Sequence, residues 1–225
     1  MISLALAALF FVGLHLLVAG TRIRERFVAV LGELGYMGAF SLAATVGIVW
    51  LCMAWAASPP AAPQWSLAFL RPVVLVLMLL AFVFVVVGLT TPSPTVTGGE
   101  GQLEGDEPAR GILRITRHPF LWGVAIWGVC HVAMNPDAPS LLFFGSLLGL
   151  AGLGPLSIDA KRRRKHGERW DRFAAVTSNV PFAAIVAGRN RLAVGELGGW
   201  RIVLAVVLYA AFLAAHPMLF GASPF

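Results

Sequence analysis

Six apolar stretches, each about as long as a bilayer is thick, constrain this chain most strongly. They cover residues 2–19, 34–57, 70–89, 119–134, 140–158 and 200–219. A bilayer core is about 30 Å thick and offers no water to the backbone, so a spanning segment must satisfy its own N–H and C=O groups. With 58% hydrophobic and 12% charged residues, the 225-residue chain is not a water-soluble domain. We therefore predict an all-α, polytopic membrane bundle of six transmembrane helices, forming a single domain over residues 1–225.

The basic residues predict how this bundle is oriented. When the six spans are threaded alternately through a membrane, every lysine and arginine except Arg71 lies on one side. The positive-inside rule identifies that side as cytoplasmic, and both termini are then non-cytoplasmic. Basic residues beside a membrane set the orientation of the spans and attract anionic lipid headgroups. These two roles account for the excess of 17 basic over 11 acidic residues. We expect membrane lipid as a partner and no nucleic acid, because the interleaving of basic and aromatic residues is missing.

The segments between the spans differ in character. Residues 21–26 form a first positive loop, and residues 90–115, rich in proline, glycine and acids, predict a flexible loop. Residues 161–170 carry the densest charge, and residues 180–187 are apolar but too short to cross, which favours an interfacial or re-entrant segment. Cys52 and Cys130 lie singly in apolar runs, so neither a disulfide framework nor a zinc site is indicated.

Two of the five histidines, His15 and His131, lie inside apolar spans. A buried imidazole needs a partner, because its desolvation without one costs a few kcal/mol. One partner would be a backbone carbonyl of a neighbouring helix. The other would be a metal or haem iron, for which neutral imidazole is the usual nitrogen ligand. His166 lies in the basic segment, where we expect it to be solvated.

Depth in the membrane offers one way to pair these histidines. At about 1.5 Å per residue from the nearest flanking arginine, His15 lies roughly 10 Å and His131 roughly 21 Å from the cytoplasmic edge. His216 comes out near the depth of His131, and His118 lies at the edge nearer His15. Depth alone pairs His131 with His216 and His15 with His118. Helix tilt and kinks could remove the offset between His15 and His131.

Arg117, His118 and Pro119 stand where the fourth span begins. Proline suits a first helical turn, and free backbone N–H groups beside an arginine make an anion site. Such a site could hold haem propionates, a lipid headgroup or the carboxylate of a cofactor. The alternative is a snorkelling arginine beside an interfacial histidine.

Several patches spread over nearly the whole length resemble the NnrU proteins, whose relatives include the plant and algal 15-cis-zeta-carotene isomerase. The matching residues are His15 with Arg22-Ile23-Arg24, the run Ile115-Thr116-Arg117-His118-Pro119-Phe120-Leu121-Trp122-Gly123, Trp127 with Cys130-His131, and Asp159-Ala160-Lys161-Arg162-Arg163 leading to Phe173, Thr177, Ser178 and Pro181-Phe182.

The resemblance implies a haem b protein of the bacterial inner (cytoplasmic) membrane. The isomerase ligands match His15 and His131, against the pairing from depth, with Arg22, Arg117 and His118 as further cofactor-binding residues. One departure is Gly128, where the isomerase has a cysteine. The resemblance implies either cis–trans isomerisation of a lipophilic polyene or a role linked to nitric oxide and denitrification, so we expect a lipophilic small molecule or nitric oxide as the second partner.

A more distant resemblance, through the Arg-His-Pro motif, is to membrane methyltransferases of the isoprenylcysteine carboxyl type. It implies a shared fold and binding of S-adenosylmethionine at the cytoplasmic face. The acidic residues expected after the fifth span are replaced here by Lys161 to Lys165. A third alternative is a non-enzymatic membrane assembly factor in which the histidines only bridge helices.

Overall fold

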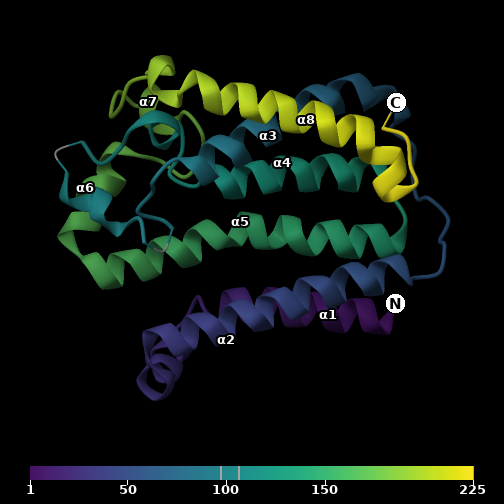
Figure 1. The fold of residues 1–225 in the computed structure, drawn as a ribbon, viewed down its shortest axis with the longest axis horizontal. Helices are drawn as coiled ribbons and strands as arrows, with labels where there is room; N and C mark the ends of the chain where they lie inside the picture. Colours follow the sequence, from purple (N-terminus) through teal and green to yellow (C-terminus); the bar gives the residue numbers. More distant parts are fainter. Residues whose placement is uncertain (97, 106, 225) are drawn as a thin grey trace. The chain divides into compact units, whose positions relative to one another are not determined.

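The computed structural model describes residues 1–96, 98–105 and 107–224, and within these ranges it contains helices and no strand (Figure 1). The all-α prediction is confirmed. The helices are α1 (Ile2–Gly13), α2 (Ile23–Ala56), α3 (Arg71–Thr90), α4 (Pro119–Met134), α5 (Ala138–His166), α6 (Glu168–Val176), α7 (Ala183–Val186) and α8 (Gly199–Phe220). A π-helical turn, Leu14–Val18, continues α1, and short 3₁₀ turns cover Ala68–Leu70, Glu100–Glu104, Gly111–Arg114 and Val194–Leu197.

The residues gather into two compact units, neither of which is continuous in sequence. The first contains Met1–Ala68 and Gly128–Ser157, and the second contains Phe69–Trp127 and Ile158–Phe225. Helices α4 and α5 each contribute one part to either unit. That residues 1–225 form a single domain stays a prediction.

In the first unit, α1 packs along α2 (Figure 1). Helix α2 begins at Ile23, so the predicted positive loop at residues 21–26 is wrong for residues 23–26. Isoleucine, arginine and glutamate continue a helix as readily as a loop, and the chain bends only at Gly32, whose φ of 71° is left-handed. The other end of α2 packs on α5, where the Trp55 ring stacks on Phe143 at 4.9 Å and its Nε1 donates to Ser140 Oγ at 3.2 Å.

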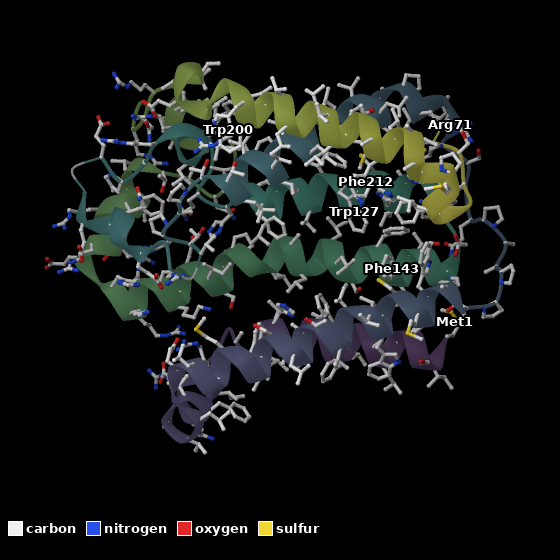
Figure 2. All side chains as sticks on the ribbon, viewed as in Figure 1. Met1, Arg71, Trp127, Phe143, Trp200 and Phe212 are labelled. Atoms are coloured by element: carbon white, nitrogen blue, oxygen red, sulfur yellow. The ribbon has the colours of Figure 1, made fainter. Side chains whose placement is uncertain are left out.

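In the second unit, α3 and α8 pack against each other over much of their length. Arg71 at the start of α3 and Trp200 at the start of α8 lie at opposite ends of the pair, so the two helices are antiparallel (Figure 2). Tyr209 of α8 donates its hydroxyl hydrogen to the Leu75 carbonyl at 3.0 Å, which satisfies a polar group on an otherwise apolar face.

Two glycines bring α3 and α4 close together. A Cβ at Gly88 of α3 would lie 2.9 Å from the backbone nitrogen of Phe120, and one at Gly123 of α4 would lie 2.9 Å from the Ala81 carbonyl oxygen. No larger side chain fits either place without moving a backbone. Small residues of this kind let helices pack closely where lipid provides no hydrophobic driving force between them. The contact fixes the start of α4, and with it the Arg-His-Pro motif.

The segment predicted as a flexible loop, residues 90–115, is more ordered than its composition indicates. Leu103 and Leu113 are buried in a cluster with Trp170 and Phe173 of α6. Proline and glycine favour turns locally, but burial of these apolar side chains outweighs that preference. At residues 97 and 106 the loop prediction falls outside the described residues. The basic run is also more regular than predicted, since residues 161–166 extend α5.

Among the described residues, four helices are long and apolar enough to cross a membrane: Ile23–Ala56, Ala68–Thr90, Ala138–His166 and Gly199–Phe220. Two other predicted spans form apolar helices that are shorter, Ile2–Val18 and Pro119–Met134. That these two also cross, and that both termini are non-cytoplasmic, stays a prediction.

Candidate functional site

A buried charged cluster is built around the Arg-His-Pro motif in the second unit. Arg117 donates from Nε and Nη2 to Oδ2 of Asp159, at 2.9 and 2.6 Å. Nε2 of His118 donates to Oδ1 of the same carboxylate at 2.7 Å. The three side chains are 15%, 1% and 17% exposed, in the order Arg117, His118, Asp159. One carboxylate from the C-terminal part of α5 therefore fixes both motif side chains.

The backbone of the motif is held by the segment that follows α6. Arg117 N–H donates to the Ser178 carbonyl at 3.0 Å, and the Thr116 hydroxyl donates to the Asn179 carbonyl at 2.5 Å. Trp122 Nε1 donates to the same Asn179 carbonyl at 2.8 Å. Three donors from the start of α4 thus converge on two consecutive carbonyls. The main chain of the motif is thus held by the segment after α6, and its side chains are held by Asp159. Because both parts are fixed, the motif is rigid.

The electrostatics of the cluster keep His118 neutral. Burial lowers the pKa of His118 below its ordinary value, the positive charge of Arg117 acts in the same direction, and Asp159 opposes them. The neutral ring with its proton on Nε2 leaves Nδ1 as an acceptor. Because the folded-state pKa is lowered, the unfolded chain binds a proton more readily as the pH falls below about 6.5, and stability from this group decreases there.

This geometry leaves the motif fewer free hydrogen-bond donors for an anion than the sequence predicted. The sequence predicted Arg117 and His118 as an open anion site, whereas both donate to Asp159 inside the protein. A haem propionate or a lipid headgroup would have to bind N–H groups that do not already donate to Asp159. That these residues bind a cofactor stays a prediction. Asp159 itself was not among the predicted site residues, although an acid directly after an apolar span is a signal for function.

His15 lies in the first unit on the π-helical turn Leu14–Val18, a feature often found at functional sites. Its Nδ1 donates to the Phe11 carbonyl at 2.8 Å. The neutral ring then presents its lone pair at Nε2, which is the tautomer and orientation that metal-bound histidines use. The rings of Phe11 and Phe40 lie 4.4 and 5.3 Å from the imidazole, so its surroundings are apolar.

His131 also belongs to the first unit, on α4. Its ring lies 4.8 Å from that of Phe144, and the side chain is half-buried. A Cβ at Gly128, one turn earlier, would lie 3.0 Å from the Leu148 Cβ, so the cysteine of the isomerase would need a shift of α5 here. His216, the alternative from depth, belongs to the second unit, where its Nδ1 donates to the Ala222 carbonyl at 2.7 Å.

The predicted site residues therefore fall into two groups. Arg117 and His118 are joined by Asp159, whereas His15, Arg22 and His131 belong to the first unit, where Arg22 is exposed at the start of α2. Within the described ranges, no three histidine, cysteine or acidic side chains cluster as a metal site would require. Two histidines suffice for haem iron, so this finding leaves the ligand prediction for His15 and His131 as it was.

A second ion pair joins Arg114, three residues before the motif, to Glu196, and the two side chains are 7% and 32% exposed. Arg114 donates from Nε and Nη2 to the two carboxylate oxygens of Glu196, at 2.8 and 3.0 Å, and from Nη1 to Asn190 at 2.9 Å. The Gly111 N–H donates to Glu196 at 2.8 Å. The hydrogen bond from Arg114 is the main reason why the pKa of Glu196 falls to about 2. No local sequence pattern indicated that Arg114 would pair with Glu196, 82 positions away.

Replacing Glu196 by glutamine is expected to lower the free energy of unfolding by about 2 kcal/mol at pH 7, since Arg114 keeps a neutral partner there but loses the closer of its two counter-charges, with Glu107 remaining at 3.5 Å. The folded-state pKa of Glu196 is about 2 against an ordinary 4.5, so its contribution is present above pH 4.5 and lost as the pH falls toward 2. Denaturant titrations in detergent at pH 7 and pH 3 should show the difference between variant and wild type shrinking. Glu104→Gln is the control, because its pair with Arg169 is exposed. A constant difference across this pH range would contradict the assignment.

Comparison with known proteins adds a family and two relatives. The profile of a family described as NnrU protein matches residues 3–224. The chain is 33% identical over 82 residues to the chloroplastic 15-cis-zeta-carotene isomerase of Zea mays, covering 36% of this chain and 22% of that protein. It is 29% identical over 116 residues to the protein of the same description from Arabidopsis thaliana, covering 50% of this chain and 32% of the relative. The chain thus spans at most about a third of these relatives. No solved structure matches it significantly.

Proposed function

Because the chain belongs to the NnrU family, we propose that it is a haem b-dependent cis–trans isomerase of a lipophilic polyene in the bacterial inner membrane. The observation that carries the proposal is its similarity to two relatives described as 15-cis-zeta-carotene isomerase, over up to half of its length. Four helices that are long and apolar enough to cross a membrane suit a substrate that dissolves in lipid.

The residues that would hold haem b are His15 and His131. For His15 the donor chemistry fits, because the Phe11 carbonyl fixes the Nδ1 proton and leaves Nε2 for iron. The neighbouring rings fit as well, since Phe11 and Phe40 beside His15 and Phe144 beside His131 place apolar surface next to both imidazoles. When bound, haem b would supply the redox-active iron that lowers the barrier to rotation about a conjugated double bond.

The chain's own residues would bind the polyene and orient the groups around it. The apolar helix faces admit the polyene from the membrane, and the π-helical turn holds the His15 ring in one orientation. In the other unit, the Nε2–H of neutral His118 is donated to Asp159, so this proton is not available for transfer. Isomerisation needs no proton transfer, and the site residues fit that requirement, since the Nδ1–H of His15 is likewise donated to a carbonyl.

Spectroscopy and turnover test the proposal together. Protein purified from haem-replete cells should show a Soret band that shifts on reduction with dithionite. After reduction it should convert 15-cis-zeta-carotene in lipid vesicles, followed as loss of the 15-cis isomer by chromatography. The unreduced protein serves as the control. A colourless preparation would contradict haem binding, and a haem-bearing protein that leaves the isomer unchanged would contradict the isomerase activity alone.

A further inference from the structure

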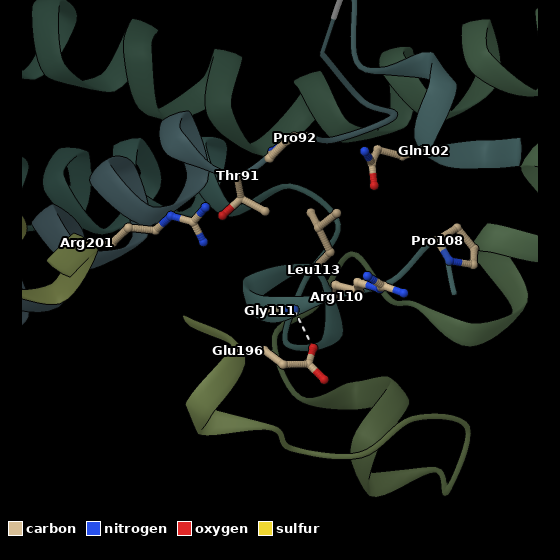
Figure 3. Close-up of a pocket in the computed structure, with 9 residues that line it drawn as sticks. All are labelled: Thr91, Pro92, Gln102, Pro108, Arg110, Gly111, Leu113, Glu196 and Arg201. Carbon is tan, nitrogen blue, oxygen red and sulfur yellow. Dashed lines mark hydrogen bonds between the residues drawn. The ribbon is translucent and has the colours of Figure 1, made fainter. Parts of the chain in front are cut away.

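A cavity of about 290 Å³ lies in the second unit, where α3 ends and α8 begins (Figure 3). Its floor is the 3₁₀ turn Gly111–Arg114, and its mouth carries exposed polar side chains. The residues that line it are Thr91, Pro92, Gln102, Pro108, Arg110, Gly111, Leu113, Glu196 and Arg201. It is separate from the Arg117–His118–Asp159 cluster, none of whose members lines it.

Two polar atoms in the wall of this cavity are buried and have no hydrogen-bond partner among the described residues. They are Nε of Arg201 and Oγ1 of Thr91. Figure 3 shows the Arg201 guanidinium directed toward Thr91, yet no hydrogen bond joins them. A buried donor without a partner is costly, and far more so when it is charged. A guanidinium and a hydroxyl that face one cavity are therefore a pair of donors for something that binds there.

The charges around the cavity show which sign of ligand fits. Glu196 is the acid in its wall, and its carboxylate already accepts hydrogen bonds from Arg114 and the Gly111 N–H. Arg110 at the mouth is 69% exposed and only loosely paired with Glu107, at 3.8 Å. Arg201 has no ion-pair partner in the part of the chain that the structure describes. The cavity thus presents uncompensated positive charge.

The position of the cavity identifies the source of an anion. Thr91 directly follows α3, and Arg201 stands in the first turn of α8; both helices are long and apolar enough to cross a membrane. The cavity then lies at the level where lipid headgroups are found. Trp200, whose ring lies 5.3 Å from the Arg201 guanidinium, is a residue type enriched at that interface.

From these observations we propose that the cavity binds a phosphate group, supplied by a phospholipid headgroup. Arg201 and Thr91 donate to the phosphate oxygens, and Arg110 and Gln102 flank the mouth. At about 30 Å³ for each water molecule, a volume of about 290 Å³ holds a phosphate with part of its glycerol and several waters. The site does not depend on the proposed isomerase activity, because no residue of that proposal contributes to it.

Lipid titration of the full-length protein tests this site. Delipidated protein in an uncharged detergent is titrated with dihexanoyl phosphatidylglycerol, with dihexanoylglycerol, which lacks the phosphate, and with inorganic phosphate. The readouts are the melting temperature and the difference in tryptophan fluorescence between the protein and Trp200→Phe, which isolates the signal of Trp200, the neighbour of Arg201, from that of the other tryptophans. Phosphatidylglycerol should raise the melting temperature, because a ligand that binds only the folded state stabilises it, and dihexanoylglycerol should not.

Two variants decide whether the cavity is responsible. Arg201→Gln should weaken phosphatidylglycerol binding about tenfold and Thr91→Val about threefold, in line with the loss of a charged and a neutral hydrogen bond. Without lipid, Arg201→Gln should melt no lower than wild type, since it removes a half-buried charge whose Nε has no hydrogen-bond partner among the described residues. Arg71→Gln, at the other end of the α3–α8 pair, is the matched control and should bind like wild type.

The titrations distinguish a phospholipid headgroup from soluble phosphate as the source of the bound phosphate group. Equal binding of inorganic phosphate and phosphatidylglycerol, both lost in Arg201→Gln, would keep the phosphate site and make soluble phosphate its ligand. Equal effects of the two lipids, or undiminished binding in both Arg201→Gln and Thr91→Val, would overturn the proposal.

Discussion

Replacing Asp159 by alanine is expected to lower the free energy of unfolding by about 3–4 kcal/mol, the loss typical when one partner of a buried ion pair is removed. The variant would leave the Arg117 guanidinium and the His118 imidazole, 15% and 1% exposed, without their shared acceptor. Denaturant titration of the purified protein in detergent micelles measures the effect. Asp159→Asn should lose less, because an amide oxygen still accepts one of the hydrogen bonds.

The control is Asp171→Ala, which removes an acid of the same type from an exposed pair. Asp171 and Arg163 are 55% and 61% exposed, so this variant should change the free energy of unfolding by less than about 1 kcal/mol. If Asp159→Ala were no less stable than Asp171→Ala, the cluster would not hold the start of α4 in place, and the motif would be free to bind an outside anion.

The second large effect is expected on haem. His15→Ala and His131→Ala should each remove or rearrange the Soret band, because each would take away one of the two proposed iron ligands. The absorption spectrum of each variant, before and after dithionite, measures the result against total protein. Phe11 and Phe40 remain around position 15, so loss of the band would report the missing nitrogen rather than a collapsed pocket.

His216→Ala is the matched control, since His216 also lies in an apolar helix and its Nδ1 also donates to a backbone carbonyl. Its spectrum should equal that of wild type. The reverse pattern, with the band lost in His216→Ala and kept in His15→Ala, would instead support the pairing by depth and refute the pairing implied by the family resemblance.

The sequence alone determined that the long apolar stretches are helical. Long apolar runs have few ways to satisfy their backbone groups without water, so each of the six predicted spans is a helix. It also singled out His15 and His131, because an imidazole in an apolar run stands out whatever surrounds it, and it located the motif at the start of α4. Where local composition competes with burial, as at Leu103 and Leu113 in the segment after α3, the prediction failed.

The tertiary structure alone decided the partners. Asp159 meets Arg117 across 42 positions of sequence and Glu196 meets Arg114 across 82, and no local pattern encodes such distances. The close approach of α3 and α4 likewise depends on what faces Gly123, not on the glycine itself. Which donors stay unsatisfied, as in Thr91 and Arg201, is known only after every other group has found its partner. Apolar surface and backbone geometry act locally and can be read along a chain, whereas hydrogen bonds between side chains depend on which distant segments meet.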